Sequence, residues 1–165
     1  AVTGVQTCAL PIFEERFLEL PREILITVMK EHQKYFSIEN ERGALLPYFL
    51  AVMNTSGDEK GLIRKGHERV LRARLTDALF FWNVDAKQTL EDRRSRLKSI
   101  VFQEKLGTYD QKIKRMAKIA KKVNALTKAR VPAEILDRAV AWSKSDLTAD
   151  MVREFTDLQG VVGGL

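Results

Sequence analysis

Apolar and polar positions alternate with a helical period over much of the chain. In residues 66–82, GHERVLRARLTDALFFW, apolar side chains recur every three or four positions, while Arg69, Arg72 and Thr76 fall on another face. The apolar stripe consists of Leu71, Leu75, Ala78, Leu79 and Trp82. The pattern predicts a helix that packs along one side and exposes guanidinium groups on the other.

A second helix is predicted over residues 88–104. Thr89 with Asp92 three positions later is a helix-start signature, and Gly107 is expected to end the helix. The residues expected to point inward are Leu90, Leu97, Ile100 and Val101.

Three further helices are predicted beyond that point. Residues 109–126 have an apolar stripe made of Ile113, Met116, Ala120 and Val123. Pro132 suits the start of a shorter helix, with apolar positions at Ile135, Leu136, Val140 and Trp142. Asp146 or Thr148 is expected to cap a last helix over residues 147–158, before Gly160.

The first third of the chain mixes helix and strand signals. Pro21 followed by Ile24 and Val28 at helical spacing favours a helix over residues 22–33. The rival interpretation is a strand over residues 24–28, because ILITV is short and rich in β-branched residues.

Residues 34–54 carry the pattern of a β-hairpin. Two apolar runs, KYFSIE and ALLPYFLAVMN, are separated by a turn that contains Asn40 and Gly43. Pro47 is expected to place the second strand at an edge or to delay its start. The polar residues 54–61 are expected to form an exposed loop.

The predicted fold class is therefore mainly α with a small β-hairpin, α+β in type. Residues 1–12 fit nothing downstream and resemble translated adapter sequence, so we expect them to be a non-native leader. Residues 13–57 are expected to form a small α+β segment, and residues 58–165 a helical region that is cut at its C-terminal end.

Charge changes the picture because it is unevenly placed. The chain carries a net charge of +6, but residues 91–130 alone hold 13 Lys or Arg against four acids, a balance of +9. The remainder is slightly acidic. A basic segment of this kind fits a polyanionic partner, most simply nucleic acid, although a solvated helix face is the equally weighted alternative.

Arginine and lysine are the candidate binding residues. The planar guanidinium group grips phosphate bidentately, whereas the ammonium group acts as a point charge. The candidate RNA-binding residues are Arg69, Arg72, Arg74, Lys112, Lys114, Arg115, Lys118, Lys121 and Lys122. The aromatic run Phe80, Phe81 and Trp82 could stack on an unpaired base, but adjacent aromatics on a helix more often pack in the core.

Catalytic and metal-binding motifs are not found in the sequence. Cys8 is the single cysteine, and His32 and His67 lie far apart, so neither a thiolate zinc site nor a histidine metal motif can be read. Glu91 and Asp92 fit capping and solvation better than acid–base catalysis. We assign no catalytic residue and no metal ligand. No apolar run approaches the roughly 20 residues of a membrane-spanning helix, and the single cysteine is consistent with a cytoplasmic setting.

Five blocks resemble, in order, the β subunit of bacterial heterotetrameric glycyl-tRNA synthetase. The blocks are LPREILITVMKEHQKYF (residues 20–36), ALLPYFLAVMN (44–54), GHERVLRARLTDALFFWNVD (66–85), LEDRRSRLKSIVFQEKLGT (90–108) and KSDLTADMVREFTDLQGVVG (144–163). Together they cover about residues 17–165, which makes the resemblance more specific than any one motif.

The resemblance implies an internal fragment of a longer chain. In that family the α subunit binds ATP, with Mg, and glycine at a class II aminoacylation site, while the β subunit contributes tRNA binding to an α2β2 assembly. This fragment would need no cofactor of its own. Its partners would be the α subunit and the tRNA for glycine, with no membrane. The region resembled leads into an HD-like helical domain, upstream of the anticodon-binding domain.

Two departures qualify what the resemblance implies. His67 stands where the family motif is expected to have Asn, a change that could alter a turn or cap without abolishing the helix. The H…HD…D ligand set of a metal phosphohydrolase is absent. The enzymatic alternative is an HD-type phosphohydrolase remnant, which soaking with Mn²⁺ and a phosphoesterase assay would test. The third alternative is a noncatalytic helical interaction scaffold.

Overall fold

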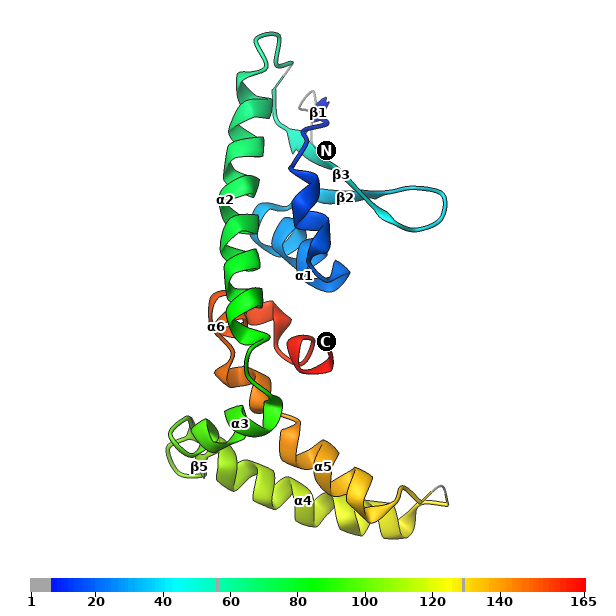
Figure 1. Cartoon of the computed structure of the whole chain (residues 1–165), viewed down its shortest axis with the longest axis vertical. Helices are drawn as coiled ribbons and strands as arrows, with labels where there is room; N and C mark the ends of the chain where they lie inside the picture. Colours follow the sequence, from blue (N-terminus) through cyan, green and yellow to red (C-terminus); the bar gives the residue numbers. More distant parts are fainter. Residues whose placement is uncertain (1–6, 56, 129) are drawn as a thin grey trace, which may run out of the picture. The chain divides into compact units, whose positions relative to one another are not determined.

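A computed structural model describes residues 7–55, 57–128 and 130–165 (Figure 1). The chain divides into two compact units, Ala1–Asn83 and Val84–Leu165. The division lies within a long helix, whereas the sequence placed a boundary between residues 57 and 58. The expectation of a mainly α fold with a small β-hairpin is confirmed.

The first unit combines a three-stranded antiparallel sheet with helices. Its elements are β1 (Thr7–Ala9), η1 (Glu15–Glu19), α1 (Arg22–Thr27), the π-helical turn η2 (Val28–His32), β2 (Phe36–Glu39), β3 (Leu45–Met53) and most of α2 (Leu62–Asp85). The helix predicted over residues 22–33 is confirmed as α1 and η2, and the strand alternative is wrong. Ile24 and Val28 are buried, as the helical spacing requires.

The predicted hairpin is confirmed, but the position of its second strand is not. The sheet order is β1-β3-β2, so β3 is central and contains Pro47. Ser37 pairs with Phe49 and Glu39 with Leu45, which leaves an irregularity in the ladder around Pro47. A proline is tolerated at a bulge because no ladder bond needs its N–H there. The expectation of an edge strand or a late start is therefore wrong.

Part of the expected leader lies in this sheet. Cys8 pairs with Val52 and Ala9 with Ala51, and Ile12 forms a bridge with Tyr48. Residues 1–6 lie outside the described residues. Whether residues 1–12 belong to the natural sequence stays a prediction.

Helix α2 begins at Leu62, four residues before the predicted pattern. The Asp58 carboxylate accepts hydrogen bonds from the backbone N–H groups of Ile63, at 3.1 Å, and Arg64, at 2.7 Å, which satisfies donors at the free helix start. The same bonds hold the pKa of Asp58 below its usual value, against the opposing effect of desolvation; the bond from Arg64 contributes most.

One side of α2 packs into the first unit, as predicted. Leu71, Leu75 and Ala78 are fully buried, whereas Leu79 and Trp82 are half-buried. His67 lies inside the helix rather than at a turn or cap, and its Nδ1 is 2.8 Å from the Tyr35 hydroxyl. The helix therefore persists with His at this position, as expected.

The second unit is built from short helices and a small hairpin. Its elements are α3 (Leu90–Arg94), η3 (Ser95–Lys98), β4 (Val101–Gln103), β5 (Gly107–Thr108), α4 (Tyr109–Leu126), α5 (Ala133–Trp142), η4 (Ser145–Thr148), α6 (Asp150–Glu154), η5 (Thr156–Leu158) and η6 (Val162–Gly164). Its core includes Leu97, Met151, Phe155 and Leu158. Helices α4 and α5 lie side by side as a helical hairpin (Figure 1).

The predicted helix over residues 88–104 is wrong beyond Lys98. Thr89 and Asp92 form the predicted capping box, but β4 and β5 follow as a hairpin. Gln103 Oε1 accepts hydrogen bonds from the backbone N–H groups of Lys105, at 2.7 Å, and Leu106, at 2.9 Å. These local bonds stabilise a turn in competition with the helix.

The predicted final helix over residues 147–158 is divided among η4, α6 and η5, and its predicted caps are wrong. Ala149, not Asp146 or Thr148, precedes α6 and gives it no side-chain cap. Instead the buried Asp85 carboxylate at the end of α2 accepts the N–H groups of Asp150, at 3.0 Å, and Met151, at 2.8 Å. A cap from 65 residues away has no local sequence signal.

Several apolar residues that the pattern placed inward are exposed. They are Phe80, Val101, Val123 and Ile135. For Phe80 the core interpretation is wrong; it contacts Phe81 edge-on, with ring centroids 5.5 Å apart. Helical period identifies the apolar side of an element but not whether another element covers it.

Candidate RNA-binding surface

Helix α4 carries most of the predicted cations, and its start is firmly set. Thr108 Oγ1 accepts the N–H of Gln111, at 3.4 Å, and Gln111 Oε1 accepts the N–H of Thr108, at 2.9 Å. This reciprocal capping box satisfies two donors at the helix start. Gly107 precedes it with φ of +81°, which favours glycine. The predicted bounds of 109 and 126 are confirmed.

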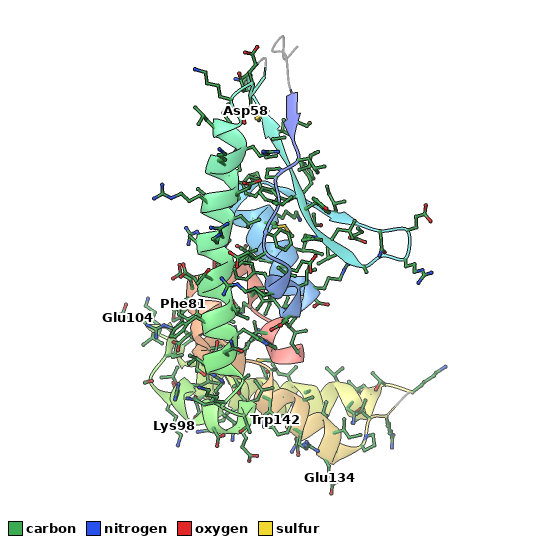
Figure 2. All side chains as sticks on the ribbon, turned by 45° about the horizontal axis from the view of Figure 1, so that its top comes forward. Asp58, Phe81, Lys98, Glu104, Glu134 and Trp142 are labelled. Carbon is green, nitrogen blue, oxygen red and sulfur yellow. The ribbon has the colours of Figure 1, made fainter. Side chains whose placement is uncertain are left out.

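The far end of α4 is clamped to α5. The Asn124 side chain donates to the Val131 carbonyl, at 2.8 Å, and accepts the Val131 N–H, at 2.9 Å. Lys121 Nζ lies 3.0 Å from an Asp137 carboxylate oxygen. The Asn124–Val131 hydrogen bonds and the Lys121–Asp137 ion pair hold the two helices as a defined hairpin. Glu134, at the start of α5, points into solvent (Figure 2).

The cations of α4 differ in whether they already contact other residues of the fold. Lys114 pairs with Asp110 at 2.8 Å, and Arg115 donates to the Leu106 carbonyl at 3.0 Å. Lys112 Nζ lies 3.6 Å from the Phe102 ring centroid, a cation–π contact. Lys118 and Lys122 are exposed and make no hydrogen bond or ion pair among the described residues. These two ammonium groups can meet an external anion without breaking a contact within the described residues.

Helix α4 itself carries one acid, Asp110, and it lies at the start of the helix. Residues 111–133 contain eight Lys or Arg and no Asp or Glu. Asp110 is buried, and the hydrogen bond from Lys114 holds the pKa of its carboxyl below the usual value. Burial acts in the opposite direction and raises this pKa, whereas the positive charges of Lys114, Arg94 and Lys98 lower it further. A continuous positive stretch of this length attracts polyanions.

The three predicted arginines belong to the first unit, so the nine candidates divide between the units. Arg72 Nε lies 3.0 Å from Glu14 Oε1, an ion pair, and Arg74 also has an interaction partner. Arg69 is exposed and makes no hydrogen bond or ion pair among the described residues. Of the six candidates on α4, five share one side of the helix, which we call the α4 basic face: Lys114, Arg115, Lys118, Lys121 and Lys122. Lys112, nine positions before Lys121, lies on the opposite side of the helix.

Two features of the basic segment are not visible in the sequence. Lys98, labelled in Figure 2, lies close enough to Asp110 to influence its pKa. Arg93 counts toward the +9 balance but is buried, donating to Asp85 Oδ1 at 2.8 Å and to the Thr148 carbonyl at 3.0 Å. The Arg93 side chain stabilises the fold and contributes no surface charge.

A shallow pocket between α3 and α5 adds little positive charge. Its walls include Arg94 and Arg138, which are balanced by Glu91 and Asp137. Arg138 also lies 4.6 Å from the ring centroid of Trp142. Anion binding is therefore favoured on α4 rather than in this pocket.

The described residues contain no cluster of three or more His, Cys, Asp or Glu side chains able to hold a metal ion. No helix in the same part of the chain is long and apolar enough to cross a membrane.

Comparison with known proteins identifies the family to which the sequence belongs. The family model "Glycyl-tRNA synthetase beta subunit" matches residues 4–165. The glycine–tRNA ligase β subunit of Acidobacterium capsulatum is 48% identical over 158 residues, covering 93% of this chain and 22% of the relative. The Natranaerobius thermophilus protein is also 48% identical, over 162 residues, with 95% and 23% covered.

A third relative, from Marinobacter nauticus, is 45% identical over 165 residues, covering 98% of this chain and 24% of its own length. The chain thus spans about a quarter or less of the relatives it matches, and the resemblance of its five ordered blocks is confirmed. The chain belongs to the glycyl-tRNA synthetase β-subunit family, whose relatives are named as subunits of a ligase.

Proposed function

We propose that this chain is an internal part of a glycine–tRNA ligase β subunit and that its α4 basic face contributes phosphate contacts to tRNA. The observation that carries the proposal is the acid-free stretch of residues 111–133, with eight cations, on a clamped helical hairpin that leaves Lys118 and Lys122 uncommitted. Fixed cations bind a phosphate backbone with affinity and salt dependence but without reading bases.

The full-length subunit supports attachment of glycine to its tRNA in ATP-dependent, class II aminoacylation. The α subunit of an α2β2 assembly holds ATP, Mg and glycine, and this part of the β subunit supplies no catalytic residue. The assembled enzyme acts in the cytoplasm. In this scheme the α4 basic face positions the substrate and takes no part in the chemical step.

The test is glycylation by the full-length β subunit reconstituted with its α subunit. Lys118→Glu combined with Lys122→Glu should raise the KM for tRNA by about tenfold, or ~1.4 kcal/mol, and leave kcat little changed, because phosphate contacts bind ground and transition states alike. The KM values for ATP and glycine should not change.

The matched control reverses two exposed cations elsewhere, Arg42→Glu with Lys87→Glu. It changes net charge equally and should leave the KM for tRNA near that of the wild type. An equal rise in both double variants would indicate only a long-range charge effect. An unchanged KM in the Lys118 and Lys122 variant would favour the scaffold alternative.

A further inference from the structure

An exposed apolar stripe runs along α4 beside the basic face. Ile119, Val123 and Leu126 are 61%, 53% and 87% exposed, and their spacing of four and three positions places them on one side of the helix. Met116, three positions before Ile119, is half-buried and continues the line. This three-four repeat is the pattern that packs against a second helix. We call Ile119, Val123 and Leu126 the apolar seam.

Helix α5 does not cover the seam. The side of α4 that meets α5 is marked by Lys121, paired with Asp137, and by Asn124, bonded to Val131. Ile113 on the inward side is buried. The seam is turned away from this contact, and its exposed fractions show that no described element covers it.

The size of the seam favours an occupant from the same polypeptide. Three side chains of this kind expose on the order of a few hundred Å², whereas a stable interface between separate proteins buries about 800 Å² on each partner. A segment of the same chain is held at high effective concentration and needs less contact area. Because this chain covers only 22% of the Acidobacterium capsulatum relative, a full-length subunit has ample sequence to supply such a segment.

The charge around the seam defines the chemistry of that segment. Arg115 and Lys122 flank the seam on one side, and Lys112 lies two turns before Ile119 on the same line. Because residues 111–133 hold no acid, the charged side chains of α4 that border the seam are all positive. Acidic flanks are then favoured and basic flanks are repelled.

We propose that the apolar seam docks an amphipathic helix with acidic flanks, supplied by the part of the full-length β subunit outside these 165 residues. The inference rests on the proposed function only in placing this chain within a full-length β subunit. The α4 basic face and the apolar seam then serve different partners, tRNA and protein, with Lys122 at their border.

The test places a photo-reactive benzoylphenylalanine at Val123 in the full-length subunit. Ala125, exposed on the other side of the same helix turn, is the matched control position. Irradiation and peptide mapping should join Val123 to an Asp- and Glu-rich peptide of the same polypeptide with apolar residues every three or four positions, and should join Ala125 to no such peptide.

Three results would overturn the proposal. They are cross-links from Val123 to a second copy, seen by mixing isotopically light and heavy subunits; cross-links to the α subunit or tRNA; and the absence of any cross-link. As a second measurement, Ile119→Gln with Val123→Gln, which keeps the charge of the helix unchanged, should raise hydrogen exchange in the cross-linked helix at least tenfold. Unchanged exchange there would also contradict docking.

The outcome is separable from that of the RNA proposal. The Ile119 and Val123 variant should retain the tRNA affinity of the wild type and lose protection of the docked helix. The Lys118 and Lys122 variant should lose tRNA affinity and keep the Val123 cross-link. Each proposal can therefore fail while the other stands.

Discussion

The buried pair of Asp85 and Arg93 shows how far one residue's role depends on contacts distant in sequence. The Asp85 carboxylate accepts bonds from the Arg93 guanidinium and from two N–H groups at the start of α6. In the sequence, Arg93 is one of many cations and Asp85 follows the end of a helix pattern. Neither residue carries a local sign of burial, because their shared partners lie near residue 150.

Arg93→Ala should destabilise the 165-residue chain by about 3 kcal/mol, because it leaves a buried carboxylate without its charged partner. Urea unfolding followed by circular dichroism measures the change. The exposed Arg96→Ala is the matched control and should lie within about 0.5 kcal/mol of the wild type. Equal effects of the two variants would contradict a structural role for the Asp85–Arg93 pair.

The Asp110 carboxyl predicts a pH dependence with a definite sign. The Lys114 hydrogen bond holds the pKa of Asp110 below its usual value, so the ionised form stabilises the fold. That stability is fully present above the unfolded pKa of about 3.9 and is lost as the pH falls through the lower folded value.

Asp110→Asn should therefore be less stable than the wild type at pH 7, and the difference should shrink as the pH falls below about 4. Thermal unfolding at a series of pH values measures it, with the exposed Asp77→Asn as control. A difference that stays constant from pH 7 to pH 3 would show that the ion pair with Lys114 is not its cause.

At the scale of elements, the sequence predicts helices better than the turns between them. The bounds of α4 follow from its capping residues and apolar spacing, and they are confirmed. The helix predicted over residues 88–104 fails beyond Lys98 because the Gln103 side chain accepts hydrogen bonds within its own turn and β4 pairs with β5. Both features act against a helix but leave its apolar period intact.

Gly107→Ala should destabilise the fold by about 1–2 kcal/mol through left-handed backbone strain. A Cβ at this position would also lie 1.6 Å from Gln111 Oε1, so the capping bond of α4 must break as the side chain moves. Urea unfolding measures the total effect.

Gly66→Ala is the matched control for Gly107→Ala. Gly66 lies inside α2 with open space around its Cβ position, so alanine should stabilise the chain by about 0.5–1 kcal/mol. Opposite signs for the two substitutions are expected. A destabilisation by both would indicate that the backbone conformation at Gly107 is not the controlling factor.

At the scale of the whole molecule, charge density predicts where the candidate surface lies. It does not predict which of its cations are without a partner in the fold. The sequence places the excess of cations in residues 91–130, and α4 lies within that range. Which cations are uncommitted depends on partners from other elements, such as Asp137 for Lys121 and the Leu106 carbonyl for Arg115. The exposure of the apolar seam is equally unpredictable, since period alone placed Val123 inward.

The central claim is that the α4 basic face contacts tRNA phosphates, and the salt dependence of tRNA binding by the full-length β subunit tests it most directly. A plot of log Kobs against log salt concentration should be linear, and Lys118→Glu with Lys122→Glu should make its slope shallower by about 1.5, the value for two lost phosphate contacts. Arg42→Glu with Lys87→Glu should leave the slope unchanged. A slope identical in all three proteins would contradict the account.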